Sequence, residues 1–196
     1  MLTVQKEIAA ALAPLLNDAS EEVRKAAAFA LEQLESLAAI EPLKESLAGG
    51  NKLQKLRALY ALGALRDERA MGAVVGALKS EEVDVRAAAI RAMASWDERA
   101  IGPLLEALDD PSLDVKVLAV EALGRFRDKR LTEVMLSLLE GQEDELRGKA
   151  VEVLGEIGDI RAKDFLVILL GDQNPSIRAR AARALGELEL PPSGTP

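Results

Sequence analysis

Apolar residues recur along the chain at the spacing of amphipathic helices. The stretch Ile101–Leu108 has apolar residues at its first, fourth, fifth and eighth positions, which places them on one side of a helix. The stretch Val115–Phe126 then repeats such a stripe, with Ala119 and Ala122 at two of its apolar positions. Comparable pairs of stretches continue to Leu190. The pattern therefore predicts a series of helix pairs, whose members are here called A and B.

One basic residue in each B stretch shows that the pairs form a regular repeat. It occurs at Arg24, Lys55, Arg86, Lys116, Arg147 and Arg178, so that successive markers are 31, 31, 30, 31 and 31 residues apart. A fixed period in this range is typical of stacked helical repeats. The predicted fold class is therefore all-α, a right-handed α-solenoid of six two-helix repeats. The repeats are expected near residues 5–36, 37–67, 68–97, 98–128, 129–159 and 160–190, within one domain of residues 1–190, and residues 191–196 are expected to form a flexible tail.

Residues that favour helix ends agree with this division. The A helices are expected near Ala9–Leu16, Ile40–Leu47, Met71–Leu78, Ile101–Leu108, Leu131–Leu138 and Ala162–Leu169. Ser and Asn side chains accept bonds from the free N–H groups of a first turn, and the predicted N-caps of four B helices are Ser20, Asn51, Ser112 and Asn174. Pro42 and Pro103 fall in predicted first turns, where a missing N–H costs little. Pro14 lies inside the first A helix, which predicts a kink or an earlier helix.

Glycine recurs inside four of the predicted B helices, at Gly63, Gly124, Gly155 and Gly186. Glycine in a helix costs about 1 kcal/mol relative to alanine. Its recurrence therefore predicts that successive B helices approach each other closely.

The run Asp110–Gly124, Asp-Pro-Ser-Leu-Asp-Val-Lys-Val-Leu-Ala-Val-Glu-Ala-Leu-Gly, resembles a HEAT-type repeat. It is most similar to the short HEAT subtype associated with phycobilin lyases. The resemblance implies that the B helices line a concave surface. It also implies ion pairs between loop aspartates and the basic markers of neighbouring repeats. Those aspartates would be Asp18, Asp110 and Asp172, and the other three loop positions hold Gly49, Ser80 and Gly141, so the ladder should be broken or rerouted there.

Composition narrows the possible functions. The chain has no Cys and no His, which removes the commonest general base and the commonest metal ligands, and no catalytic motif, cofactor site or metal site is predicted. The net charge of −8 disfavours nucleic acid as a partner. No signal peptide is evident, and the apolar runs are too short to span a bilayer. We expect a soluble, cytoplasmic protein.

The candidate binding residues are the B-helix positions furthest from the apolar stripe. Seven of them are predicted to contact a protein or peptide partner: Phe29, Arg57, Tyr60, Arg91, Leu118, Glu121 and Glu152. Phe29 and Tyr60 suggest an apolar pocket that anchors a partner. The alternative, which we favour, is that both rings pack against neighbouring B helices. Glu121 and Glu152 suggest contact with a basic partner, against the simpler interpretation of a solvated face.

The function predicted from these residues is a non-enzymatic scaffold or adaptor for protein–protein interaction. Resemblance to phycobilin lyases implies the alternative, a factor that attaches a bilin chromophore. The end repeats bear on self-association. Lys25 and Glu32 are interpreted as a polar cap on the first B helix, whereas Ala179, Ala182 and Gly186 leave the last one poorly capped, which predicts a weak homodimer through the last repeat.

Overall fold

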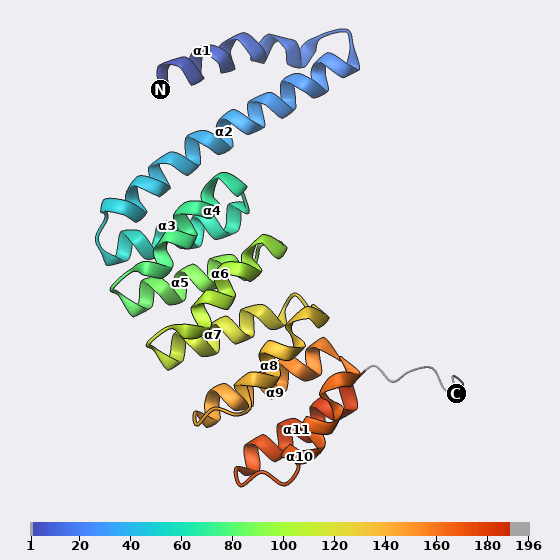
Figure 1. The fold of residues 1–196 in the computed structure, drawn as a ribbon. Helices are drawn as coiled ribbons and strands as arrows, with labels where there is room; N and C mark the ends of the chain where they lie inside the picture. The colour runs from blue at the N-terminus through green and yellow to red at the C-terminus, as the bar shows by residue number, and fades with distance from the viewer. Residues whose placement is uncertain (1, 189–196) are drawn as a thin grey trace. The chain divides into compact units, whose positions relative to one another are not determined.

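A computed structural model describes residues 2–188, with side chains from Val4 onward. The predicted tail and Leu190 lie outside this range. Within it the chain forms helices and no strand, as predicted. The elements are α1 (Leu2–Leu12), η1 (Ala13–Asn17), α2 (Glu21–Gly49), α3 (Lys52–Leu65), α4 (Glu68–Gly76), η2 (Ala77–Lys79), α5 (Val83–Met93), η3 (Glu98–Ala100), α6 (Ile101–Glu106), η4 (Ala107–Asp109), α7 (Leu113–Gly124), η5 (Lys129–Leu131), α8 (Thr132–Leu138), α9 (Asp144–Ile157), η6 (Ile160–Ala162), α10 (Lys163–Leu169) and α11 (Pro175–Glu187) (Figure 1).

The contacts divide the chain into two compact units, Met1–Ala77 and Leu78–Pro196. Each is described by itself below. One domain over residues 1–190 stays a prediction.

In the first unit, the predicted boundary between repeats one and two is wrong. The helix α2 continues through it for 29 residues and contains Pro42 in its interior rather than in a first turn. The next boundary, between α3 and α4, does form a corner. There Arg66 adopts a left-handed conformation with φ of 52°, and Asp67 caps α4. Ser36 stands 31 residues before Asp67, and the residues around it, Glu-Ser-Leu-Ala-Ala, contain no helix breaker. Helix formers at this point therefore let the two predicted helices merge.

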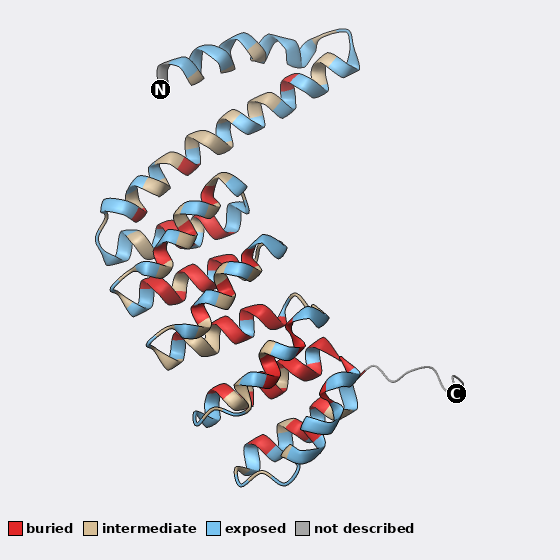
Figure 2. Ribbon diagram, viewed as in Figure 1, coloured by how far each residue is buried: buried red, intermediate tan, exposed pale blue. Residues whose placement is uncertain are grey.

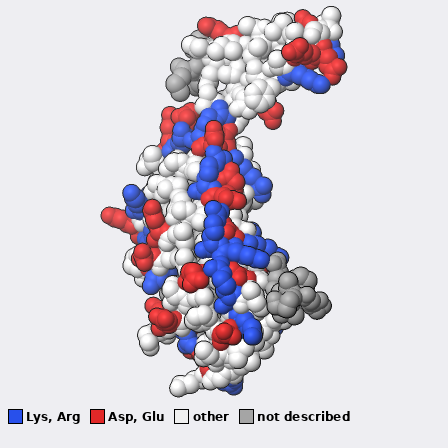
Figure 3. All heavy atoms as spheres, turned by 45° about the vertical axis from the view of Figure 1, so that its right-hand side comes forward, with Lys and Arg blue, Asp and Glu red and all other residues white. Residues whose placement is uncertain are grey.

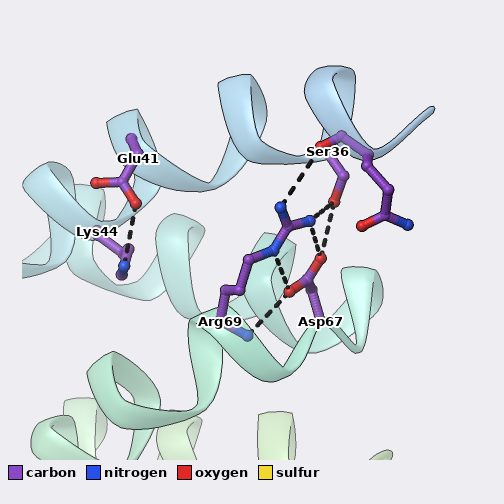
Figure 4. Close-up of polar contacts among 6 residues, drawn as sticks. Ser36, Glu41, Lys44, Asp67 and Arg69 are labelled. Atoms are coloured by element: carbon purple, nitrogen blue, oxygen red, sulfur yellow. Dashed lines mark hydrogen bonds and ion pairs between the residues drawn. The ribbon is translucent and has the colours of Figure 1, made fainter. Parts of the chain in front are cut away.

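The position of Ser36 shows which part of α2 is covered by α3. Its hydroxyl donates to Asp67 Oδ2 at 2.9 Å and accepts from Arg69 Nη2 at 3.1 Å (Figure 4). The end of α3 therefore lies beside the middle of α2, and α3 runs back along the second half of that helix. The first half packs on α1 and η1 instead.

Other features of the first unit follow the sequence. The α-helical hydrogen bonding of α1 ends at Leu12, and Pro14 lies at the start of the 3-10 helix η1, as expected for a residue that cannot donate from its nitrogen. Asn51 caps α3 by accepting from Gln54 N at 3.0 Å, while Gln54 Oε1 accepts from Asn51 N at 2.8 Å. This is a complete capping box.

In the second unit, the B helices α5, α7, α9 and α11 pack on one another in sequence, and Figure 2 shows that buried residues concentrate on α5, α7 and α9. The predicted B stripe is confirmed, since Val115, Ala119 and Leu123 are fully buried. The predicted A stripe is shifted by one residue: Ala100, Leu104 and Ala107 are buried, whereas Ile101, Leu105 and Leu108 are half-buried. Trp96, which aligns with core positions, is half-buried as well.

Close approach of successive B helices is confirmed at two glycines. A Cβ atom on Gly124 would lie 2.7 Å from Val153 Cγ2, and one on Gly155 would lie 2.9 Å from the backbone Cα of Ala184. A side chain at Gly124 would overlap side chains of the next B helix, and one at Gly155 would overlap its backbone.

Replacing Gly155 with alanine should destabilise the second unit although alanine favours helix. We expect a loss of about 1–3 kcal/mol in the free energy of unfolding, because the new methyl group meets the backbone of α11. The matched control is Gly102→Ala in α6, where nothing lies within 4 Å of a Cβ; its stability should stay unchanged or rise by up to about 1 kcal/mol. Urea unfolding of both variants measures the difference, and equal effects would refute the packing role of Gly155.

Candidate partner-binding surfaces

In the first unit, α3 presents an exposed face that is partly apolar. Leu53, Arg57, Tyr60 and Ala64 follow at i, i+4, i+7 and i+11 and all four are exposed, Tyr60 by 84%. These positions share one side of a helix. The structure thus brings Arg57 and Tyr60 together as predicted, and adds Leu53, which the sequence analysis did not select.

Phe29 is exposed as well, by 63%. The interpretation that both aromatic rings pack against neighbouring B helices is therefore wrong. That interpretation assumed that the first two B helices stack on each other. Because α2 is continuous, they do not stack.

The same continuity keeps Phe29 and Tyr60 apart. Phe29 lies seven residues before Ser36 on α2, and Tyr60 lies seven residues before Asp67, which contacts Ser36. Since α3 runs back along the second half of α2, Phe29 and Tyr60 lie on opposite sides of this junction. At 1.5 Å of rise per residue, they are about 20 Å apart along the helix axis. A single pocket containing both rings is not formed.

In the second unit, the predicted binding residues lie on the three B helices α5, α7 and α9. Arg91 and Glu121 are exposed, and neither forms an ion pair with another described residue. Leu118 and Glu152 are half-buried. Glu152 accepts from Arg180 Nη1 at 2.5 Å and lies 2.8 Å from Lys149 Nζ. Glu152 therefore links α9 to α11, and Arg91 and Glu121 are the charges available to a partner.

The acidic positions do not assemble into a metal site. Among the described residues, no group of three or more Asp or Glu could hold a metal ion.

The implied ladder of loop aspartates and basic markers is present in part. Arg86 donates to Asp110 at 2.7 and 3.0 Å, and Arg147 pairs with Asp172. Burial alone would raise the pKa of Asp110, but the Arg86 guanidinium holds that pKa below its usual value. At the repeat with Gly141 in the loop, Lys116 Nζ lies 3.8 Å from Glu143 instead, so this step is rerouted as anticipated.

The markers also hold their own loops. Arg24 donates to the Asp18 carbonyl at 2.7 Å, Arg86 to the Ser80 carbonyl at 2.8 Å and Arg178 to the Asp172 carbonyl at 2.8 Å. Each side chain thus satisfies a carbonyl of its own loop and leaves its remaining donors for a neighbouring repeat.

A second ladder, which was not predicted from the sequence, is built from the motif Asp-X-Arg at four B-to-A corners. The motif occurs at Asp67–Arg69, Asp97–Arg99, Asp128–Arg130 and Asp159–Arg161. In every copy the carboxylate accepts from the backbone N–H and from the guanidinium of the arginine two residues on. The recurrence of the motif at the marker period was the signal that could have revealed it.

These corner arginines also reach the preceding repeat within each unit. Arg130 Nη2 donates to Glu98 at 3.0 Å, and Arg161 Nη2 donates to the Lys129 carbonyl at 2.7 Å. Figure 3 turns the corners between the B helices and the following A helices forward and shows basic and acidic side chains interleaved along them.

Asp159 is the most enclosed of the corner aspartates. It is 5% exposed and accepts from the fully buried Thr132 hydroxyl at 3.0 Å. Hydrogen bonding to Arg161, opposed by burial and aided by Thr132, lowers the pKa of Asp159 from 3.8 to about 2. The carboxylate is therefore ionised throughout the physiological range.

A hollow of about 420 Å³ lies at the loop before α11. Its lining includes the polar residues Asp144, Arg147, Asp172, Gln173 and Asn174. Arg147 pairs with both carboxylates, and Asn174 Nδ2 donates to Asp144 at 2.8 Å. These groups satisfy one another, so the hollow belongs to the loop ladder.

The comparisons with known proteins agree with this architecture. Residues 101–186 match the family model of HEAT repeats, and residues 23–49 match the model of the PBS lyase HEAT-like repeat. Residues 101–186 therefore consist of HEAT repeats and residues 23–49 match the PBS-lyase-like subtype, so the predicted resemblance is confirmed. No curated protein matches the chain.

Solved structures share the fold at low sequence identity. The complex of CpcE and CpcF of phycocyanin lyase from Nostoc sp. PCC7120 contains a chain that matches this protein with 23% identity and a TM-score of 0.64. The match covers 76% of this chain and 64% of that one. This protein thus spans less than two thirds of that neighbour. A designed armadillo repeat protein in complex with the peptide (KR)4 has 18% identity and a TM-score of 0.58, over 91% and 98% of the two chains. Both likenesses establish the helical-repeat fold alone.

Within the described range, none of the helices has the length and apolar character needed to cross a membrane.

Replacing Asp159 with asparagine should destabilise the second unit at neutral pH by about 1–3 kcal/mol, because it removes a charge-assisted bond to Arg161 at a buried site. Because folding lowers the pKa of Asp159, its carboxylate stabilises the fold at pH values above the pKa of an unfolded aspartate, which is near 4. This contribution is lost as the pH falls towards 2, and it should be missing in the variant. Urea unfolding at neutral pH and near pH 3 measures both effects. Asp97→Asn, at the exposed equivalent, should give a smaller loss; equal losses would argue against a role for burial.

Proposed function

We propose that this protein is a non-enzymatic interaction scaffold that holds a protein or peptide partner against the exposed faces of its B helices. The observation that carries the proposal is the face of α3, on which Tyr60 is 84% exposed beside Leu53, exposed by 55%. Tyrosine and leucine side chains gain free energy when a partner removes them from water.

Tyr60 and Arg57 are suited to recognition as well as to burial. A tyrosine offers a rigid ring and a hydroxyl, and an arginine offers five donors, which is why both residue types are enriched among binding hot spots. The helix that carries them is fixed by its capping box and by packing on α2. Little conformational freedom is therefore lost when a partner binds.

The charges of the second unit would select among partners. Arg91 and Glu121 are exposed and carry opposite charges on the successive helices α5 and α7. Such exposed charges affect association rate and specificity more than affinity. A partner with charges of both signs therefore suits this surface better than a polyanion, consistent with the net charge of −8.

The comparisons support a binding role for this class of fold. The armadillo neighbour was solved with a peptide bound, and the CpcE–CpcF neighbour was solved as a complex of two proteins. A cytoplasmic location belongs to the proposal, since a chain without cysteine suits a reducing compartment.

Truncating Tyr60 should weaken partner binding while leaving the fold intact. We expect Tyr60→Ala to reduce affinity by about 30-fold, the effect of removing a hot-spot residue worth roughly 2 kcal/mol. The melting temperature should not change, because the ring contacts solvent. The measurement is capture of partners from the native lysate on wild-type and variant protein, followed by titration of the purified partner.

Two further variants sharpen this test. Val83→Ala changes another exposed apolar residue, 41% exposed and outside the predicted face, and should retain full binding. Phe29→Ala should act independently of Tyr60→Ala, because rings about 20 Å apart do not couple. Undiminished capture by Tyr60→Ala would remove α3 from the proposal.

A bilin-attachment factor is the second candidate function, favoured by the PBS-lyase-like repeat at residues 23–49 and by the phycocyanin lyase neighbour. If the scaffold proposal holds, mixing the protein with a free bilin leaves the absorption spectrum of the bilin unchanged. A shifted and sharpened visible band, or bilin that becomes attached to an added phycobiliprotein subunit, would favour the alternative.

A further inference from the structure

The last repeat exposes a large apolar surface. On α10, Phe165 is 48% exposed and Ile168 is 73% exposed. In the preceding repeat the residues 31 positions earlier are the half-buried Val134 and the polar Ser137. The surface of α10 thus has the apolar character of a repeat interface although it faces solvent.

The neighbouring helix α11 has the small residues that B helices use to pack on the next repeat. Gly148 and Gly155 of α9 lie against Arg180 and Ala184 of α11. The residues 31 positions later are Ala179 and Gly186, which are exposed, and nothing lies within 4 Å of a Cβ at Gly186. This surface of α11 therefore has the shape that receives another B helix.

The basic marker of this repeat shows which charge the surface would accept. Arg86 and Arg147 each bind a carboxylate of the following repeat, at Asp110 and Asp172. Arg178 donates to the Asp172 and Gln173 carbonyls of its own loop at 2.8 and 3.1 Å. Among the described residues no carboxylate pairs with it. A docked repeat would complete this pair with a loop aspartate.

The first repeat offers such an aspartate in the required arrangement. Asp18 Oδ1 accepts from Ser20 N at 2.8 Å. Asp110 and Asp172 accept in the same way from Ser112 N and Asn174 N, both at 2.8 Å. No guanidinium among the described residues binds the Asp18 carboxylate, since Arg24 takes only its carbonyl.

The first repeat, which carries Asp18, also exposes apolar residues on α1 and η1. Val4, Ile8 and Leu16 are exposed by 57, 44 and 41%. Lys25 and Glu32 were interpreted as a polar cap, but they occupy the positions equivalent to Gly148 and Gly155. They therefore lie on the side of a B helix that faces the following repeat, and they do not cover the outer side of the first repeat.

We propose that this protein associates head to tail with copies of itself, with the α10–α11 surface of one copy docked on α1, η1 and the start of α2 of the next. In this contact the Arg178 guanidinium binds the Asp18 carboxylate, as Arg147 binds Asp172 within the chain. The contact joins two different surfaces, so it generates chains or closed rings of copies rather than a two-fold dimer. The proposal is independent of the partner-binding role.

The experiment measures the average mass of the purified protein by sedimentation velocity, from low micromolar to several hundred micromolar. Wild-type protein should pass beyond the dimer as concentration rises. Gly186→Glu places a charge on the docking surface and should remain a monomer. The matched control, Gly102→Glu, changes another exposed helical glycine with open space around it and should behave as wild type. A wild-type protein that stays monomeric throughout overturns the proposal.

A charge exchange tests the pair itself. Asp18→Lys and Arg178→Glu should each abolish self-association, because each brings like charges together. A mixture of the two variants should associate, since every contact between them joins opposite charges. Restored association supports the Asp18–Arg178 contact even if Arg178→Glu loosens its own loop. A mixture that stays monomeric, or a wild-type mass that stops at the dimer and ignores Asp18→Lys, overturns it.

Discussion

The close packing of each B helix on the next is the interaction on which the second unit depends. At Gly124 and Gly155 the neighbouring helix lies so near that a single methyl group would overlap Val153 or the backbone of Ala184. This approach buries Ala119, Ala150 and Ala181 completely and lets a core of Leu, Val and Ala close without many aromatic residues. It also places each loop within reach of the preceding basic marker, so that Arg86 can bind Asp110.

Where this packing is absent, the array changes. Glu32 occupies the position of those glycines in the first repeat, and a glutamate there prevents the approach that the glycines allow. Ser36 replaces the aspartate that caps the other corners, and α2 continues through the predicted boundary. Ser36 nevertheless keeps its contact with Asp67 and Arg69, so the corner hydrogen bonds survive without the corner itself. The exposure of Phe29 is a consequence of this change.

Two ladders of charge pair the polar residues at the loops and corners of the repeats, and exposed side chains outside these ladders are the ones available to a partner. Glu152 belongs to the stack through Arg180, whereas Arg91 and Glu121 do not. Tyr60 and Leu53 are largely exposed on the surface of α3. The two ends follow the same rule. Among the described residues, Arg178 lacks the carboxylate, and Asp18 lacks the guanidinium, that complete the equivalent ion pairs elsewhere in the chain.

The sequence by itself determined the helical-repeat fold, the buried stripe of the B helices, the N-cap positions and the close approach at glycine, because each depends on local spacing and on the repeat period. It also contained the Asp-X-Arg motif, whose role follows from the N-cap chemistry of aspartate. Only the tertiary structure decided that α2 is continuous, since the residues around Ser36 favour helix in either arrangement. The structure alone therefore separated Phe29 from Tyr60 and showed which charges are paired, because both depend on which helices become neighbours.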